Sequence, residues 1–151
     1  MATAAESTSP VLRSYFADYA EFHRTPGNKL CHYVGIPVIV LSLLALLARV
    51  PLFTVGGFSV TLAEATLLAA TAYYLRLDAG LAVLMLALGV AFDAAARVVP
   101  FAAALAAFGA GWALQFVGHY VYEKKSPAFF RHMAHLLVGP LWILGRLSGR
   151  A

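Results

Sequence analysis

The sequence predicts an all-α integral membrane protein, a bundle of four transmembrane helices with one additional helix at each end of the chain. Three observations predict this class. Of the 151 residues, 62% are hydrophobic and only 12% are charged, whereas soluble domains average about 45–50% apolar and about 25% charged residues. The mean hydropathy is +0.79. The apolar residues also form long stretches between short polar turns, which is typical of helices that cross a bilayer.

The N-terminal region divides into a tail and a surface helix. Residues 1–10 are polar and rich in alanine and serine, without the basic start and apolar core of a secretory signal, and they predict a disordered tail. Residues 11–151 predict a single transmembrane helical domain. Residues 11–22 predict an amphipathic helix on the membrane surface, because their apolar residues recur at helical spacing. These residues are Leu12, Tyr15, Phe16, Tyr19 and Phe22.

Four apolar stretches follow as the predicted spans. They cover approximately residues 33–48, 60–75, 79–96 and 101–122. Pro51 and the Gly56-Gly57 pair predict a loop after the first, and residues 76–78 predict a tight polar turn after the second. The last stretch, residues 128–147, is interrupted by charged residues, histidines and Pro140, and predicts an interfacial or re-entrant helix. A fifth full span is the alternative that the sequence leaves open.

The positive charges indicate which side of the membrane each loop occupies. With four spans, three segments share one side and carry seven Lys and Arg residues: Arg13, Arg24, Lys29, Arg76, Lys124, Lys125 and Arg131. The loops on the other side carry only Arg49 and Arg97. By the positive-inside rule the first side is cytoplasmic. All five histidines lie there, which predicts a site at the cytoplasmic face: His23, His32, His119, His132 and His135.

His23, His32 and His119 are the candidate metal ligands. An imidazole at the edge of a hydrocarbon layer is costly unless it binds or pairs with something. His23 and His32 are nine residues apart across a Pro-Gly turn, so a loop and a helix start can bring them together. Neutral imidazole binds iron, zinc, copper and nickel. The alternative is that each histidine separately hydrogen-bonds a lipid headgroup or the backbone.

Further polar residues surround these histidines. Gln115, His119 and Glu123 recur at i, i+4 and i+8, which predicts one inward helix face. Gln115 predicts a packed, hydrogen-bonded role near the site. Glu123 is predicted as a metal ligand or as the partner of an imidazole N–H, with a solvated helix-end charge as the alternative. Asn28 is interpreted first as the N-cap of the first span and second as a positioning residue. The single cysteine, Cys31, excludes an internal disulfide.

The remaining charges favour lipid over nucleic acid as a partner. The net charge of +4 is spread without a basic stripe, as suits contact with anionic headgroups. Glu64 and Asp93 lie toward the opposite membrane face and are expected to be partnered or interfacial, so they lend little support to a transport path. His132 and His135 are expected to be interfacial residues rather than ligands.

Three sequence blocks resemble a known family. They are residues 23–37 (HRTPGNKLCHYVGIP), residues 111–128 (GWALQFVGHYVYEKKSPA) and residues 136–144 (LLVGPLWIL). The spacings His-x4-Asn-x3-His and Gln-Phe-x-Gly-His-x3-Glu-Lys-x2-Pro-Ala resemble those of the 2-hydroxy fatty acid dioxygenase family, small multi-pass membrane proteins of fungi and bacteria. The resemblance covers residues 15–144, although the middle spans match only in hydrophobicity.

The resemblance implies an iron(II)-dependent dioxygenase of lipid α-oxidation, which converts a 2-hydroxy fatty acid and O2 to a fatty acid one carbon shorter. It implies His23, His32 and His119 as Fe2+ ligands and Asn28, Gln115 and Glu123 as catalytic positions. It also implies a multi-pass protein of the bacterial inner membrane, or of the endoplasmic reticulum in a eukaryote. The sequence departs from the family at Arg131-His132, so no role for His132 is implied.

The residues by themselves leave other functions open. The polar blocks could shape one edge of a non-enzymatic lipid-binding or scaffold protein. They could also ligate haem or another metal in a histidine-ligated membrane protein, or zinc in a hydrolase acting on lipids, because the ligand type alone does not decide the metal.

Overall fold

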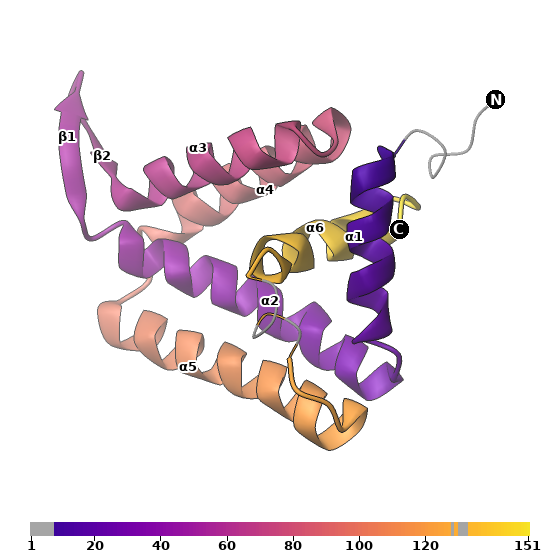
Figure 1. Ribbon diagram of the computed structural model, residues 1–151. Coiled ribbons are helices and arrows are strands. Elements are labelled where there is room, and N and C mark those ends of the chain that lie inside the picture. The colour runs from indigo at the N-terminus through magenta and orange to yellow at the C-terminus, as the bar shows by residue number, and fades with distance from the viewer. Residues whose placement is uncertain (1–7, 128, 130–132) are drawn as a thin grey trace.

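The computed structural model describes residues 8–127, 129 and 133–151, and Figure 1 shows their arrangement. The elements in chain order are α1 (Pro10–Glu21), α2 (Pro26–Leu47), β1 (Pro51–Val55), β2 (Phe58–Thr61), α3 (Leu62–Leu75), α4 (Ala79–Ala96), α5 (Phe101–Val117), the π-helix η1 (Gly118–Glu123) and α6 (His135–Leu147). The predicted helical bundle is confirmed. Residues 1–7 of the predicted tail lie outside the described residues.

The described part of the chain contains three helices that are long and apolar enough to cross a membrane. They are α2 with 22 residues, α4 with 18, and the continuous α5–η1 segment with 23. The second predicted span, α3, has 14 residues, which at 1.5 Å per residue extend about 21 Å. That is shorter than the hydrocarbon core of about 30 Å. The structure therefore supports a helical membrane protein, with three candidate spans rather than a demonstrated four.

The first span begins earlier than predicted and has a different cap. Thr25 is the N-cap of α2, and its hydroxyl accepts a hydrogen bond from the backbone N–H of Asn28 at 3.3 Å. Pro26 occupies the first helical position, where its missing N–H costs nothing. The interpretation of Asn28 as the N-cap is therefore wrong, and Asn28 and His32 both lie inside the helix.

The loop predicted after the first span is a β-hairpin. Strands β1 and β2 pair antiparallel around Gly56 and Gly57, whose φ angles are 55° and 82°. Two consecutive residues with positive φ match the twist of a tight hairpin, and glycine adopts this conformation without a Cβ clash. The flanking residues are mainly β-branched or aromatic, a strand signal that the sequence prediction passed over.

The apolar face of α1 is buried inside the protein. Leu12, Phe16 and Tyr19 join a core cluster with residues of α6, such as Trp142, and of the α3–α4 turn, such as Leu77. The apolar face of this helix therefore packs against protein, and its position along the membrane surface stays a prediction. An amphipathic stripe shows only that one helix face is buried and does not show what buries it. Here α6, rather than lipid, packs against that face.

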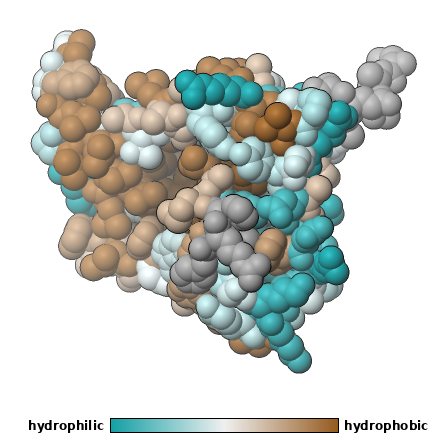
Figure 2. Space-filling view, viewed as in Figure 1, coloured by the Kyte–Doolittle hydropathy of each residue, from teal (hydrophilic) through white to brown (hydrophobic). Residues whose placement is uncertain are grey.

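The bundle has two different ends (Figure 1). At one end lie α1, α6, the α3–α4 turn, the start of α2 and η1, and we name it the histidine end. At the other end lie the β-hairpin and the α4–α5 connection, and we name it the hairpin end. Hydrophilic residues gather over the first end and apolar residues over the second in the view of Figure 2. The segments predicted to share one side of the membrane thus do lie at one end.

Helices α2 and α5 pack closely because glycines face each other. A Cβ atom added at Gly111 would lie 2.7 Å from Cγ1 of Ile39 and 3.2 Å from the carbonyl oxygen of Gly35. A Cβ added at Gly35 would overlap the side chain of Gln115. Small residues let two helix backbones approach each other. This close approach brings α5 and η1 against the first turns of α2, where the candidate site lies.

Candidate metal centre

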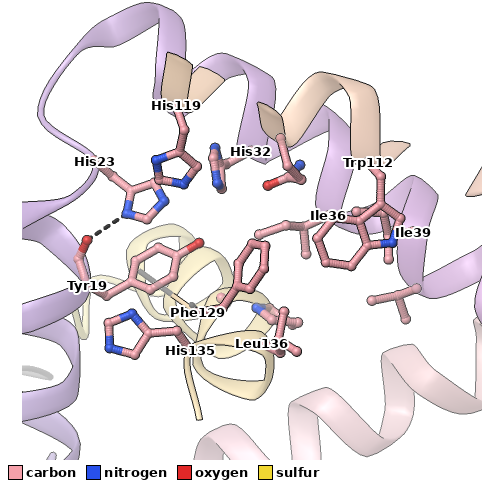
Figure 3. Close-up of a pocket in the computed structure, with 14 residues that line it drawn as sticks. Tyr19, His23, His32, Ile36, Ile39, Trp112, His119, Phe129, His135 and Leu136 are labelled. Atoms are coloured by element: carbon pink, nitrogen blue, oxygen red, sulfur yellow. Dashed lines mark hydrogen bonds between the residues drawn. The ribbon is translucent and has the colours of Figure 1, made fainter. Parts of the chain in front are cut away.

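Three histidines from three separate elements meet at the histidine end. His23 lies between α1 and α2, His32 lies near the start of α2, and His119 lies in η1. One nitrogen of each ring lies within 4.8 Å of the corresponding nitrogens of the other two. The ring centroids are 4.3 Å apart for His23 and His32, and 4.9 Å apart for each pair with His119. All three side chains are buried (Figure 3).

Backbone carbonyls orient two of the rings. Nδ1–H of His23 donates to the carbonyl of Tyr19 at 2.6 Å, and Nδ1–H of His32 donates to the carbonyl of Asn28 at 2.9 Å. Each carbonyl belongs to the residue four positions earlier, so local backbone geometry sets both tautomers. Nε2 is then the lone-pair nitrogen of each neutral ring, which is the arrangement that metal-ligating histidines use.

Two buried nitrogens of this cluster lack a hydrogen-bond partner among the described residues. They are Nε2 of His23 and Nδ1 of His119. Buried polar atoms are nearly always paired, so an orphaned lone pair calls for an explanation. Burial, followed by repulsion from His32, lowers the pKa of His23 to about 3. Its ring is therefore neutral at physiological pH and able to bind a cation.

The π-helix η1 determines the position of His119. The regular α-helical face predicted for Gln115, His119 and Glu123 is interrupted, because η1 replaces the last turns of α5 from Gly118 onward. The widened turn ends at Lys124, whose φ is 54°. Short π-helical insertions re-aim side chains and are frequent at functional sites. The three residues still face α2, but the π-helix spaces them differently from an ideal α-helix.

Glu123 binds the loop before α2 rather than an imidazole. Its carboxylate accepts hydrogen bonds from the backbone N–H of Arg24 at 3.0 Å and of Thr25 at 3.1 Å. It also accepts from the Thr25 hydroxyl at 2.9 Å and from Nδ2 of Asn28 at 3.1 Å. A carboxylate at the N-terminus of a helix also accepts hydrogen bonds from the free N–H groups there and interacts favourably with the helix dipole. Glu123 therefore joins the end of η1 to the loop that carries His23.

Asn28 and Gln115 are buried beside the cluster. Besides Glu123, the Asn28 amide donates to the carbonyl of Phe22 at 2.9 Å, and the Asn28 carbonyl holds His32. Asn28 thus links both ends of the turn that separates His23 from His32. The Gln115 amide donates to the carbonyl of Cys31 at 3.4 Å. The structure brings both predicted residues to the site, as neighbours of the imidazoles.

A cavity adjoins the three imidazoles (Figure 3). Tyr19 forms part of its wall and stacks on His23, with ring centroids 3.9 Å apart and planes 9° apart. The Tyr19 hydroxyl is directed into the cavity in this view. Burial raises the pKa of this phenol, so it stays protonated and can donate a hydrogen bond. Its place four residues before His23 was the available signal, but sequence reasoning assigned Tyr19 only to an apolar face.

His135 also lines the cavity, although it is not one of the clustered ligands. Its side chain is 3% exposed, and Nε2 lies 2.7 Å from Oδ2 of Asp18. The expectation of an interfacial residue missed this burial, and no local signal links two residues 117 positions apart. His132, by contrast, lies outside the described residues. Arg24, Lys124 and Lys125 are exposed and do not line the described part of the cavity.

The donor set fits one transition-metal ion. Two ligands at about 2.1 Å from a common ion are at most about 4.2 Å apart, so nitrogens within 4.8 Å need to move only slightly. In the described part of the chain this group contains no carboxylate or thiolate. Three imidazoles leave coordination positions open for substrate, as in catalytic sites, but they do not by themselves distinguish iron from zinc.

Comparisons with known proteins identify relatives of this chain. The family model described as "2-hydroxy-palmitic acid dioxygenase Mpo1-like" matches residues 10–151. A protein of Saccharomyces cerevisiae, "2-hydroxy-palmitic acid dioxygenase MPO1", is 34% identical over 136 residues, which cover 88% of this chain and 77% of the yeast protein. No solved structure matches the chain.

Proposed function

This chain belongs to the Mpo1-like family, and on that premise we propose that it is an iron(II)-dependent dioxygenase that shortens 2-hydroxy fatty acids by one carbon. The observation that carries the proposal is the convergence of three buried imidazoles on the wall of a mostly apolar cavity. The reaction balances when the hydroxylated carbon becomes the new carboxyl group and the old carboxyl carbon leaves as CO2, with one water formed from the remaining atoms of the acid and O2.

His23, His32 and His119 are the residues that would hold the metal. When bound, Fe2+ supplies the Lewis-acid and redox chemistry that a reaction with O2 requires, whereas Zn2+ has no redox chemistry. The yeast relative is named a dioxygenase, and because a reaction with O2 requires redox chemistry, that name supports iron over zinc. It also supports a long-chain 2-hydroxy acid as the substrate class.

Asn28 and Glu123 act as positioning residues in this proposal. The side-chain amide of Asn28 donates to Glu123 and to the carbonyl of Phe22, and so fixes the turn whose backbone carbonyl at Asn28 holds the His32 ring. Glu123 ties η1, and with it His119, to the loop before α2. Outer partners of this kind orient metal ligands and raise their affinity, typically by about 10- to 100-fold. Neither side chain needs to touch the substrate for its loss to weaken the site.

Tyr19 and Gln115 are the side chains proposed to bind the polar head of the substrate. Both line the cavity next to the imidazoles. A protonated phenol and an amide N–H both donate hydrogen bonds, which suit a carboxylate or an α-hydroxyl group. Because the described walls of the cavity carry no Lys or Arg side chain, the exposed Arg24, Lys124 and Lys125 can attract the carboxylate only during its approach from outside.

We place the histidine end at the cytoplasmic face of a bacterial inner membrane, or of the endoplasmic reticulum in a eukaryote. The excess of positive charge in the segments at this end supports that orientation. A cysteine introduced at the exposed Lys125 should react with an impermeant maleimide in inside-out vesicles and not in right-side-out ones. Labelling with the opposite preference would reverse the orientation.

Metal analysis combined with an oxygen-dependent assay tests the function directly. Purified protein in detergent should retain iron near one ion per chain and lack the visible absorption of haem. It should convert 2-hydroxypalmitate to pentadecanoate in air and leave it unchanged under nitrogen. Palmitate, which lacks the hydroxyl group, should not react.

The competing lipid-binding interpretation makes a different prediction in the same assay. A scaffold or lipid-binding protein would bind 2-hydroxypalmitate without changing it in either atmosphere. Iron-loaded protein that binds the acid but consumes no O2 would exclude the dioxygenase and favour this alternative. A zinc hydrolase would retain zinc and show no dependence on O2.

A further inference from the structure

The cavity beside the imidazoles is polar at one end and apolar along the rest of its length. Ile36, Ile39 and Val40 line it from α2 and follow His32 by four, seven and eight residues, so they share one helix face with that histidine. Val40 therefore lies about 12 Å farther along α2 than His32 does. Figure 3 shows Ile36 and Ile39 on the side of the cavity away from His23.

Helix α5 supplies the facing wall with the same spacing. Trp112 and Gln115 line the cavity and precede His119 by seven and four residues, so they extend the helix face of this histidine back along α5. Figure 3 shows the indole of Trp112 next to Ile36 and Ile39, on the side of the cavity away from His23. Two helix faces that pack closely through glycines thus enclose one slot, which begins at the imidazoles and runs toward the hairpin end.

The third wall comes from α6 and is also apolar. It is formed by Leu136, Gly139 and Pro140. Leu136 is 39% exposed, so the slot reaches the outside of the protein beside an apolar side chain. Among the described residues that line the cavity beyond the histidines, Tyr19 and Gln115, only Trp112 carries a hydrogen-bonding side-chain group, its indole N–H, and the other side chains are apolar. A ligand in this part therefore gains mainly from apolar burial.

We propose that this slot binds the acyl chain of the substrate and limits its length. We name it the acyl slot, formed by Ile36, Ile39, Val40, Trp112, Leu136 and Pro140. The acid enters with its polar head at the imidazoles, and its chain lies in the groove lined by α2, α5 and α6, with the tail toward Val40. This inference rests on the proposed function for the identity of the head group, and on the geometry of the cavity for the direction of the chain.

The first test compares a long and a short acid in one enzyme preparation. In the iron-loaded Val40→Phe protein, the larger ring should block the far part of the slot. The ratio of kcat/KM for 2-hydroxypalmitate to that for 2-hydroxyhexanoate should fall by about tenfold, the discrimination typical of a small steric change in an apolar pocket. Because both substrates report on the same protein, this ratio does not depend on the folded or iron-loaded fraction.

A matched control and two contrary outcomes make this test decisive. Val34 lies on the same helix, is 48% exposed and does not line the cavity, so Val34→Phe should leave the ratio within twofold of wild type. An unchanged ratio in Val40→Phe would overturn the acyl slot while leaving the dioxygenase intact. Absence of turnover of both acids by wild type would instead reject the proposed function.

The second test needs neither iron nor turnover. The chain has two tryptophans, Trp112 in the slot and Trp142 in the core, where it is 2% exposed. In metal-free Trp142→Phe protein, 2-hydroxypalmitate carrying bromine atoms at mid-chain should quench the fluorescence of Trp112. In the matched Trp112→Phe protein, the same acid should leave Trp142 unquenched.

Competition shows whether this binding is specific to the acid. Unbrominated 2-hydroxypalmitate should restore the fluorescence of Trp112, whereas an equal concentration of phosphatidylcholine should not. Equal displacement by the phospholipid would show an unselective lipid groove and would overturn the proposal. So would the absence of quenching by the brominated acid.

Discussion

Arg97 forms ion pairs with two carboxylates at the hairpin end of the bundle, whereas three imidazoles converge at the histidine end. Arg97 donates to Glu64 and, at 3.3 Å, to Oδ2 of Asp93, so charges of opposite sign meet there. At the other end, His23 and His119 each bury a nitrogen that no described residue pairs. Opposite charges stabilise each other without a ligand, but a group of lone pairs gains a partner only when a cation binds.

The difference predicts that the hairpin end contributes to stability and that the histidine end contributes to binding. Besides the Arg97 pairs, Arg49 donates to the carbonyl of Val99 at 2.5 Å, and both arginines lie over phenylalanine rings. These contacts join the β-hairpin, α2, α3, α4 and α5 to one another. Around the histidines, two backbone carbonyls orient the rings of His23 and His32, and the Glu123 carboxylate holds the loop after His23. Substitutions at the two ends should therefore separate metal binding from stability.

Loss of one imidazole should have the largest effect on activity. His32→Ala removes a donor from the cluster and should abolish iron retention and turnover of 2-hydroxypalmitate. The loss should exceed the approximately 10- to 100-fold that outer partners of a metal site contribute. Iron stoichiometry and product formation measure it, and the helical signal in circular dichroism should persist. Full iron occupancy in this variant would remove His32 from the site.

Displacement of η1 should have the next largest effect. A Cβ atom added at Gly118 would lie 2.5 Å from Oδ1 of Asn28 and 3.1 Å from Cβ of Cys31. Gly118→Ala should push His119 away from α2 and lower kcat/KM by about 100-fold, as small misplacements of reacting groups do. Gly109→Ala is the control in the same chain segment, because a Cβ at Gly109 meets nothing within 4 Å. Equal activity of the two variants would contradict this role of η1.

Removal of the charge of Glu123 should have an intermediate effect. In Glu123→Gln, an amide replaces the carboxylate that accepts from Arg24, Thr25 and Asn28. Iron affinity should fall by about tenfold, at the lower end of the range for outer partners. A titration of iron against a chelator measures this change. Glu21→Gln, at an exposed position of α1, should change nothing, and unchanged affinity in Glu123→Gln would reject its positioning role.

Disruption of the ion pairs at the hairpin end should leave activity nearly unchanged. In Arg97→Gln, Glu64 and Asp93 lose their cation, and the free energy of unfolding should fall by about 1–2 kcal/mol. Fully buried pairs cost about 3–5 kcal/mol when one partner is removed, but the Arg97 side chain is 33% exposed and partly screened. Iron stoichiometry should stay within twofold of wild type. Loss of iron here would show that the two ends are coupled.

The sequence predicted much of the fold because apolar stretches and breaks are local properties. The helical class, the approximate positions of α2, α4 and α5 and the grouping of segments at one end all follow from hydropathy and charge. The β-hairpin was missed because the prediction used only Pro51 and the two glycines, which indicate a turn, and not the β-branched and aromatic residues on either side of them. The cap of α2 was misassigned because Thr25 and Asn28 are both good capping residues.

The candidate site was likewise predicted from the sequence only in part. His23, His32 and His119 were predicted as a group, and they do lie together. Their nearest neighbours were less predictable, because Tyr19 resembles any other aromatic residue on an amphipathic helix. The pairing of His135 with Asp18 joins residues 117 positions apart. No periodic pattern encodes such a contact.

Residue type and spacing are enough to establish that the chain forms apolar helices and that three histidines lie next to them. The tertiary structure decided which nitrogens are left unpaired, where Glu123 binds, and which helix faces enclose the cavity. Those outcomes depend on the close packing of α2 against α5 and on the extra residue per turn in η1. Both set the register between helices, and register is a property of two surfaces in contact rather than of either helix alone.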